Sequence, residues 1–399
     1  MLRKILVLGF AISVITSGWA QENPYWFASG KTIKKASEWL AVIETAPYSD
    51  FAPDKVKINE IRTALANKNS LDNTHKDEID RQLTGIILNF LKVLQQGNIK
   101  LDYDEISIPR DSIYLHQLQN FKQKDHVNDI VARLESKDPE YLVLKKYLHD
   151  SITPRDSLKY KSVLLAMNYR KYLTTNYQAE CIIVNIPEAE ARYYRSGFPV
   201  MKMRTVVGRK KNPTPLISCY MTSIITFPFW NVPFTIAVKE LLPKVQKNEN
   251  YLEQNNFEIV DSKGNLIEDD DLNWKNYNEK NFPYFFRQAT GADNSLGVLK
   301  FNLQNPFSIF LHSTSSPASF KRDIRFLSHG CVRLEKPLEL ADALLRGKID
   351  LEELKKGKSD TESKTLKLPA KIPVFIIYDP VVTVGKKVTF LPDVYKLIK

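Results

Sequence analysis

The hydrophobic periodicity of the chain changes between residues 173 and 180, and this change limits the fold more than any other feature. Before it, apolar residues recur at helical spacing, most clearly in "EIDRQLTGIILNFLKVLQQGN", where Gly97 supplies a stop. Similar patterns run through "SIYLHQLQNF", "PEYLVLKKYLHDSI" and "SLKYKSVLLAMNYRKYL". These stripes are typical of the core of a helical domain.

After residue 180, β-branched and aromatic residues gather in short runs. Two β runs are predicted in "CIIVNIPEAEARYYRSGFPVMKMRTVVG", joined through the turn "RSG". Further strands are expected at "CYMTSIITF", "LGVLKFNL", "FSIFLHS" and, around a Gly-Lys turn, in "IPVFIIYDPVVTVGKKVTFLPDVY". A helix is expected in "KPLELADALLRG", where Pro337 suits a first turn. The fold class is therefore α+β, with a helical domain followed by a mainly-β domain.

The first 20 residues have the pattern of a secretory signal peptide. Arg3 and Lys4 precede an apolar run at 5–15, and cleavage is expected after Ala20. The apolar run falls short of the roughly 20 residues that span a bilayer, and no cysteine follows it. We therefore expect an exported protein without a permanent membrane anchor.

The charge of the chain is moderately positive. It has 57 basic and 46 acidic side chains; without Arg3 and Lys4, 55 basic side chains remain, a net charge of +9. The longest basic runs, "GRKKNP" and "ELKKGKSD", are short and are interpreted as solvated turns. We therefore predict no nucleic-acid partner.

The cysteine count selects one candidate thiol. Only Cys181, Cys219 and Cys331 are present, and an odd number leaves at least one free in an oxidising compartment. Cys181 and Cys219 lie in strand-like apolar runs, where buried small residues are expected, and their pairing with each other stays open. Cys331 lies in the polar stretch "FLSHGCVRLEKPLEL", so it is the candidate nucleophile.

A thiol nucleophile requires a base and donors for the developing oxyanion. His329 is two residues away, and His312 ends the run "FSIFLHS", where a rigid strand could hold its imidazole against the thiolate. The Ser313 carbonyl is the expected acceptor for the other ring nitrogen. The amides of Gly330 and Cys331 are candidate oxyanion donors, and Arg333 could pair with a substrate carboxylate.

The remaining histidines are His75, His116, His126 and His149, and they show no metal-ligand spacing. No metal or organic cofactor is implied.

The segment from "HST" to the cysteine of "SHGCVRL", 19 residues after its histidine, resembles the signature of the L,D-transpeptidases, whose YkuD-like catalytic domain serves bacterial cell-wall synthesis. The stretches "FPFWNVPFTIAVKELLPKV", "RQATGADNSLGVLKFNLQNPFSIFLHST" and "TFLPDVY" are similar to the larger periplasmic branch of that family. The resemblance covers residues 165–399, and the helical region before it resembles, more weakly, the scaffold domain of that branch.

The resemblance implies a signal peptide at 1–20, a helical scaffold-like domain at 21–164, and a β-sandwich-like catalytic domain at 165–399 with a capping insertion at about 240–285. It implies a periplasmic enzyme in which Cys331 attacks the third residue of a peptidoglycan tetrapeptide stem and releases D-alanine. His312 would be the base, oriented by Ser313, with Gly330 and Cys331 holding the oxyanion. Substrate-binding roles are expected for Ser328, His329 and Arg333.

An amine of a second stem would resolve the thioester into a 3-3 cross-link, and carbapenem-type β-lactams would acylate the same thiol. The chain departs from the family pattern at Ser313, where an acid is common, and at Phe310, where a tyrosine is frequent. No separate peptidoglycan-binding domain is evident.

Several alternatives stay open on the sequence alone. Water as acceptor would make an L,D-carboxypeptidase, and a protein amine would anchor protein to the wall. A non-catalytic peptidoglycan-binding scaffold would have no need for the cysteine, both histidines and the glycine together. A general cysteine peptidase is disfavoured, because no Asn or Asp partner signature accompanies the thiol. The acceptor, the oligomeric state and the role of the helical domain are left open.

Overall fold

The computed structural model describes residues 25–45, 51, 54–107, 111–120, 125–151, 157–177, 179–268, 272–358 and 361–398. The predicted signal peptide at 1–20 lies outside these residues. The chain divides into two compact units. The first comprises residues 1–98 and 109–137, and the second comprises residues 99–108 and 138–399.

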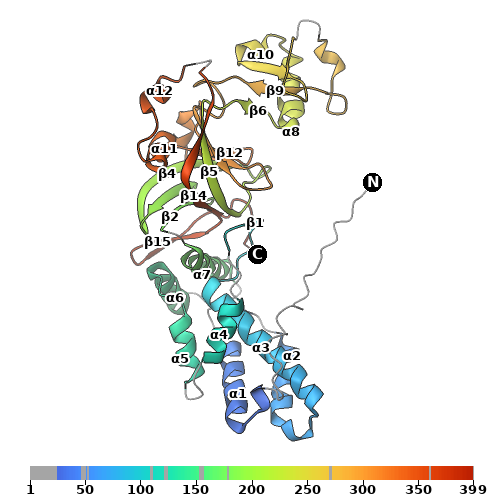
Figure 1. Cartoon of the computed structure of the whole chain (residues 1–399), viewed down its shortest axis with the longest axis vertical. Coiled ribbons are helices and arrows are strands. Elements are labelled where there is room, and N and C mark those ends of the chain that lie inside the picture. Colours follow the sequence, from blue (N-terminus) through green and yellow to red (C-terminus); the bar gives the residue numbers. More distant parts are fainter. Residues whose placement is uncertain are drawn as a thin grey trace. The chain divides into compact units, whose positions relative to one another are not determined.

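The first unit is helical, as the periodicity predicts (Figure 1). Two of its helices begin at acidic caps: the Asp54 carboxylate accepts from the amides of Val56 and Lys57, and the Asp72 carboxylate accepts from the His75 amide at the start of α3. Gly97 ends α3 with φ +74°. Its elements are η2 (Tyr25–Phe27), α1 (Gly30–Thr45), α2 (Lys55–Ala66), η3 (Lys68–Ser70), α3 (Asn73–Gln96), α4 (Asp111–Asn120) and α5 (Val127–Leu134).

The amphipathic faces of these helices form one core. Trp26, Trp39 and Phe90 are almost fully buried in it. The core is separate from those of the second unit, so this unit buries its own apolar surface.

The second unit is built on a closed sheet. Strand β14 pairs with both β2 and β5, so the order β5-β10-β11-β13-β4-β3-β2-β14 returns to its start. β1 adds to β5 and β12 adds to β4. The strands are β1 (Tyr103–Asp104), β2 (Glu180–Asn185), β3 (Glu190–Arg195), β4 (Phe198–Gly208), β5 (Ile217–Thr226), β10 (Leu299–Leu303), β11 (Phe310–His312), β12 (Phe326–Ser328), β13 (Val332–Leu334) and β14 (Lys364–Ile377).

The predicted mainly-β domain is thus confirmed, and its strands form one closed ring. The 14-residue strand β14 closes this ring, because it is long enough to pair with β5 along most of its length and with β2 near its end. Around it lie η6 (Pro317–Lys321), α11 (Pro337–Leu345), α12 (Leu351–Lys356) and the hairpin of β15 (Val381–Val384) and β16 (Lys387–Phe390).

Two helices at or before the predicted boundary belong to this second unit, and the second of them crosses that boundary. They are α6 (Pro139–Ser151) and α7 (Leu158–Asn176). The Tyr172 hydroxyl hydrogen-bonds Ser218 of β5 at 3.0 Å, and the Tyr172 ring packs edge-on against Phe375 of β14. The second unit therefore begins before the boundary at residue 164/165 that the sequence suggests, because α7 carries a face that the sheet buries.

The polar insertion forms a small subdomain, called the cap below and coloured yellow in Figure 1. It is wider than the predicted 240–285 and has its own four-stranded sheet, in the order β6-β9-β7-β8. Its elements are β6 (Trp230–Asn231), α8 (Phe234–Ile236), the π-helical turn η4 (Ala237–Leu241), α9 (Leu242–Val245), α10 (Tyr251–Gln254), β7 (Phe257–Val260), β8 (Leu266–Ile267), η5 (Trp274–Asn276) and β9 (Phe285–Gln288).

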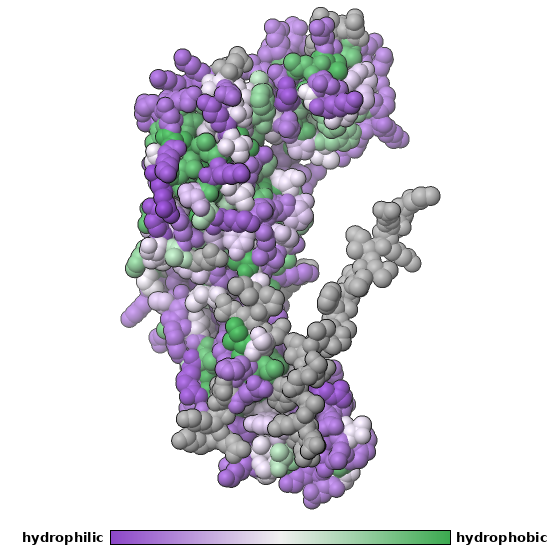
Figure 2. Space-filling view, viewed as in Figure 1, coloured by the Kyte–Doolittle hydropathy of each residue, from purple (hydrophilic) through white to green (hydrophobic). Residues whose placement is uncertain are grey.

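The cap is stabilised by aromatic side chains, with Trp274 and Phe286 buried at its centre. On the face seen in Figure 2, hydrophilic side chains cover most of the second unit, with hydrophobic ones interspersed over the barrel and the cap.

Candidate active site

Three adjacent strands place ionisable side chains on one face of the barrel wall. His312 of β11 pairs with Lys300 of β10 in antiparallel register and with Arg333 of β13 in parallel register. Residues paired across neighbouring strands point to the same side. The alternate residues, such as Phe301 and Leu311, are fully buried in the core. The strand alternation therefore brings Lys300, His312 and Arg333 together.

The loop between β12 and β13 carries the candidate nucleophile. Ser328 is buried, and its hydroxyl donates to the Cys331 carbonyl at 2.6 Å and accepts the Gly330 amide at 3.2 Å. Gly330 has φ +121°, and an added Cβ would lie 3.3 Å from Ile309 Cδ1. Only glycine adopts this conformation without strain. The loop is thus tightly specified by its own residues.

These contacts bear on two of the roles expected from the sequence. The Ser328 hydroxyl is engaged within the loop, where it fixes the loop geometry. The Gly330 amide already donates to Ser328, which leaves the Cys331 amide as the candidate oxyanion donor of the two.

A second layer of hydrogen bonds holds the loop from behind. The Thr214 hydroxyl donates to the Gly330 carbonyl at 2.7 Å and accepts the Gly208 amide at 2.8 Å. The Tyr395 hydroxyl in turn donates to the Gly208 carbonyl at 2.5 Å and accepts the Thr214 amide at 3.2 Å. The stretch after "GRKKNP" and the C-terminal segment "TFLPDVY" therefore support the loop, which sequence reasoning did not identify.

Cys331 is half-buried, whereas Cys181 and Cys219 are buried and unpaired. Its Sγ atom lies 3.8 Å from the Ser308 carbonyl. Burial raises the pKa of the Cys331 thiol to about 11, although the Phe310 backbone and the charges of Lys300 and Arg333 act in the opposite direction. The resting thiol is therefore protonated at neutral pH.

His312 is buried and uncharged. Burial, with a smaller effect of the Arg333 charge, lowers the pKa of the His312 imidazole to about 3. The backbone of Ser313 and that of Leu296 oppose this shift. Among the described residues, Nδ1 of His312 has no hydrogen-bond partner. A neutral ring is the form that can accept a proton.

The thiol lies in the loop just before β13 and the imidazole on the neighbouring strand β11, but the two do not hydrogen-bond each other. His312 is paired with Arg333, two positions beyond Cys331, and Sγ is directed at the Ser308 carbonyl. The expected hydrogen bond between Cys331 and His312 is therefore not formed in this structure. Such catalytic contacts are often long before substrate binds.

Close packing fixes the backbone on the other side of His312. The Ser313 amide donates to the Leu299 carbonyl at 2.9 Å. Gly297 has φ +62°, and a Cβ there would lie 2.3 Å from the Ser313 hydroxyl oxygen. The glycine of "SLGVLKF" thus allows the two segments to approach, a role that the sequence alone did not suggest.

Lys300 is a site residue that sequence reasoning missed. Its Nζ lies 4.4 Å from the centroid of the Phe310 ring. Burial lowers the pKa of both Lys300 and Arg333, and the neighbouring Cys331 opposes the shift in each. The signal was present in "LGVLKFNL", where a lysine stands between two core residues of a strand.

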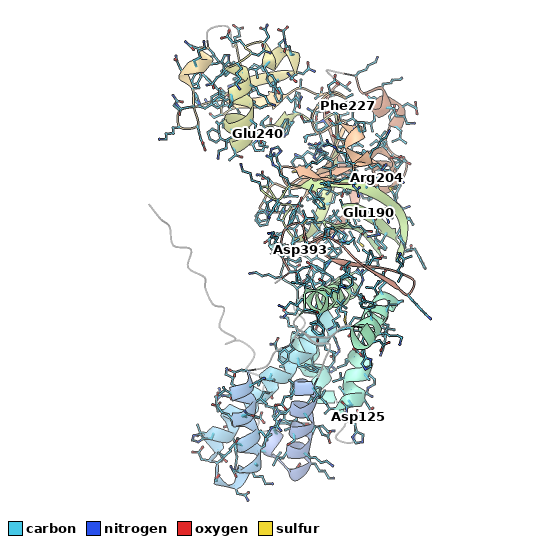
Figure 3. The ribbon with its side chains drawn as sticks, turned by 180° about the vertical axis from the view of Figure 1, so that it is seen from behind. Asp125, Glu190, Arg204, Phe227, Glu240 and Asp393 are labelled. Carbon is cyan, nitrogen blue, oxygen red and sulfur yellow. The ribbon has the colours of Figure 1, made fainter. Side chains whose placement is uncertain are left out.

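His329 points toward the cap rather than along the strands. Its Nε2 lies 2.6 Å from Glu240 Oε1, in the π-helical turn η4, and 2.6 Å from Arg209 Nη2. Arg209 also pairs with Glu240 at 3.0 Å. Partial burial would raise the pKa of Glu240, but the hydrogen bonds from His329 and Arg209 hold it below its ordinary value. Figure 3 shows Glu240 on the side of the cap nearest the barrel.

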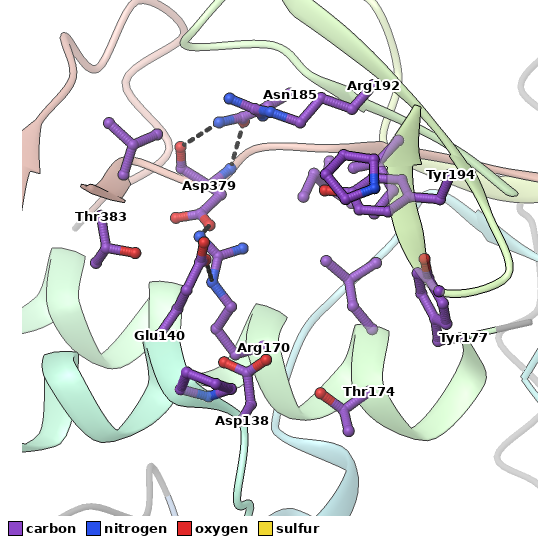
Figure 4. A pocket seen from close by; sticks show the side chains of 17 residues that line it. Asp138, Glu140, Arg170, Thr174, Tyr177, Asn185, Arg192, Tyr194, Asp379 and Thr383 are labelled. Atoms are coloured by element: carbon purple, nitrogen blue, oxygen red, sulfur yellow. Dashed lines mark hydrogen bonds and ion pairs between the residues drawn. The ribbon is translucent and has the colours of Figure 1, made fainter. Parts of the chain in front are cut away.

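A cavity of about 680 Å³ lies between α6, α7 and the edge of the barrel, and none of these residues lines it. Arg170 bridges Glu140 at 2.7 Å and the buried Asp379 at 3.0 Å (Figure 4). Asn185 accepts the Asp379 amide and donates to its carbonyl. This network joins α7 to the strands.

Within the described residues, no group of three or more His, Cys, Asp or Glu side chains could hold a metal ion. The helices described there include none that is long and apolar enough to cross a membrane.

Comparison with known proteins agrees with this architecture. Residues 179–369 match the family model of the L,D-transpeptidase catalytic domain, YkuD, and residues 20–148 match that of the Scaffold domain. The second unit of the chain therefore carries an L,D-transpeptidase catalytic domain, and a Scaffold domain precedes it. Both resemblances stated from the sequence are confirmed.

A Haemophilus influenzae protein named "Putative L,D-transpeptidase" is 34% identical over 233 residues. The match covers 58% of this chain and 47% of that protein, so the chain spans about half the length of this relative.

Solved structures with similarity include the L,D-transpeptidase from Mycobacterium smegmatis, at 12% identity and a TM-score of 0.25 over 50% of this chain and 58% of that one. Another is L,D-transpeptidase 3 from Mycobacterium tuberculosis in complex with a faropenem-derived adduct, at 13% identity and a TM-score of 0.23 over 50% and 60%. Because these TM-scores are below 0.5, the assignment rests on the family matches.

Proposed function

We propose that the protein is a periplasmic peptidoglycan L,D-transpeptidase that uses Cys331 as its nucleophile. The observation that supports this most directly is the position of Cys331. Among the three cysteines it alone is partly exposed, and it lies in a hydrogen-bonded glycine loop beside the strand that carries His312. The catalytic-domain match at 179–369 includes both residues.

The proposed reaction has two steps. The Cys331 thiol gives its proton to the neutral His312 ring while Sγ attacks the carbonyl of the third residue of a donor tetrapeptide. The Cys331 amide stabilises the oxyanion. The C–N bond then breaks, the imidazolium returns its proton to the leaving D-alanine amine, and a thioester remains. The side-chain amine of an acceptor stem attacks the thioester and loses a proton to His312. The C–S bond then breaks and His312 gives this proton to the Cys331 sulfur, which leaves the free thiol and a 3-3 cross-link.

We further propose that β-lactams of the carbapenem class acylate the same thiol. One solved relative is a complex with imipenem and another carries a faropenem-derived adduct. Export to the periplasm and binding of peptidoglycan stems belong to the same proposal, since both are what an enzyme of this class requires.

The test is the intact mass of the mature protein after incubation with a carbapenem and then with disaccharide-tetrapeptide. We expect a drug adduct and a cross-linked dimer with the unmodified protein and with Cys219→Ala, but with Cys331→Ala neither. Release of tripeptide alone would instead indicate an L,D-carboxypeptidase. A folded protein that gives no adduct and no product would contradict the proposal in favour of a binding role.

The role of His312 is tested by acylation kinetics. His312→Ala should slow carbapenem acylation by roughly a hundredfold, because the general base is lost. His329→Ala is the matched control, since its ring contacts Glu240 and Arg209. An unchanged rate in His312→Ala, with a large loss in His329→Ala, would move the base to His329.

A further inference from the structure

Two cationic side chains beside Cys331 have no carboxylate partner in the described part of the chain. They are Lys300 and Arg333. The Nε of Arg333 is buried and has no hydrogen-bond partner among the described residues. Other partly buried arginines are paired: Arg170 with Asp379 at 3.0 Å and Arg287 with Glu258 at 2.7 Å. Arg325, whose Nε also has no partner among the described residues, donates to backbone carbonyls instead. A partly buried charge without a countercharge is costly, so Lys300 and Arg333 are candidates for binding an anion.

The register explains how both cations can act on one small group. Lys300 and Arg333 flank His312 on the strands on either side of β11. Neighbouring strands are about 4.8 Å apart, and both side chains are long and flexible. The Lys300 ammonium lies over the ring of Phe310, which is also on β11. The charges of both Lys300 and Arg333 act on the Cys331 thiol. A small anion beside the thiol is within reach of both.

Formation of a resting thiolate does not explain these cations. Burial keeps the pKa of Cys331 near 11 although both charges are present. They are therefore available to an anion that arrives with the substrate.

We propose that Lys300 and Arg333 form a carboxylate-binding subsite that takes the free C-terminal carboxylate of the donor peptide. The inference rests on the proposed function. In such a donor the carboxylate is one residue beyond the attacked carbonyl, which is at most about 3.5 Å along the chain. It is therefore the anion nearest the thiol during attack. Arg333 would engage it through its planar fork and Lys300 as a point charge. A donor with a further residue would place a neutral amide there.

The test uses two alkylating reagents that share a leaving group and differ in charge. Iodoacetate carries a carboxylate and iodoacetamide a neutral amide. Both react with the same thiolate, so the ratio of their rate constants is independent of the thiol pKa. We expect this ratio at Cys331 to exceed that of N-acetylcysteine by roughly tenfold or more, as charge-assisted hydrogen bonds allow. Intact mass against time gives both rates.

The diagnostic variant is Lys300→Met, which keeps most of the length of the side chain and removes its charge. The ratio should fall several-fold in Lys300→Met and be largely kept in Lys300→Arg. Lys371→Met is the matched control, because the Lys371 ammonium also lies over an aromatic ring, that of Tyr220 at 5.6 Å. If both rates in Lys300→Met fall by the same factor and the ratio stays as in the unmodified protein, the subsite is ruled out.

A second measurement needs no variant. N-acetyl-D-alanine should protect Cys331 from iodoacetamide saturably, and N-acetyl-D-alanine amide should not. Equal protection by both, or by neither, contradicts the subsite. Because alkylation requires only the thiol, the ratio can be measured even in a protein without transpeptidase activity. Failure of the subsite and failure of the proposed function are therefore distinguishable.

Discussion

The chemistry of the candidate site is governed by the burial of two side chains. Burial raises the pKa of the Cys331 thiol to about 11 and lowers the pKa of the His312 imidazole to about 3. Both groups are therefore neutral between these values, and a resting thiolate–imidazolium pair is disfavoured. Substrate binding has to supply the geometry in which the proton moves as the carbonyl is attacked.

This resting state predicts how the thiol responds to pH. The thiolate fraction rises tenfold per pH unit below the thiol pKa, so alkylation of Cys331 by iodoacetamide should rise about tenfold per unit from pH 7 to pH 10. N-acetylcysteine, measured in parallel, should level off above its ordinary pKa near 8.5. A Cys331 rate that is already constant at pH 7 would show that the protein holds a thiolate instead.

Among the structural elements, the cap and the catalytic loop are joined by a few polar contacts. Glu240 from the turn η4 meets His329 and Arg209, and His329 is two residues from the nucleophile. Single π-helical turns often occur at functional sites. We therefore expect the position of the cap to be coupled to the conformation of the loop.

Removing the charge of Glu240 tests this coupling. In Glu240→Gln, amide hydrogen exchange should become faster in η4 and in the loop 328–331, while the thermal midpoint changes little, because exposed ion pairs contribute about 1 kcal/mol or less. The control is Glu279→Gln, which removes an exposed carboxylate 3.5 Å from Lys239 within the cap. Identical exchange in the two variants would mean that Glu240 does not hold the cap to the loop.

At the scale of the whole second unit, the free energy of unfolding depends on how α6 and α7 attach to the barrel. The attachment contains a buried charge, since Asp379 is fully buried and depends on Arg170 for its countercharge. Burial raises the pKa of Asp379, and the Arg170 charge opposes this effect.

Arg170→Met should therefore destabilise the second unit by about 3–5 kcal/mol at neutral pH, because it leaves the Asp379 carboxylate buried without a partner. The loss should shrink as the pH falls toward 4. A carboxyl whose folded-state pKa is raised favours the folded state at low pH, and the penalty grows as the pH rises. Thermal unfolding across this range checks both statements. Lys355→Met, which removes an exposed pair with Glu352, should change the midpoint little at any pH. An equal loss at pH 4 and pH 7 would contradict the assignment to Asp379.

Local patterns in the sequence were sufficient to predict which segments form helices and which form strands, and to find the motif around Cys331. Helical stripes, β-branched runs and the Gly97 stop depend on neighbours a few residues away, and the structure has α3, β4, β5, β14 and α11 where they were expected. Cys331, Gly330 and His312 could be selected because their residue types and spacing are unusual within a single stretch.

The partners of these residues required the tertiary structure. Lys300 enters the site through cross-strand register, Glu240 reaches His329 across 89 positions of sequence, and Tyr395 supports the loop from the C-terminal segment. Residues far apart in the chain bury Cys331 and so determine whether its thiol is ionised. They also determine whether the Ser328 hydroxyl is free to contact a substrate, and no local sequence pattern indicates either property. The sequence therefore identified the reactive groups from short-range spacing, whereas closure of the barrel, the charge state of the thiol and the unpaired cations depend on contacts between residues far apart in the chain.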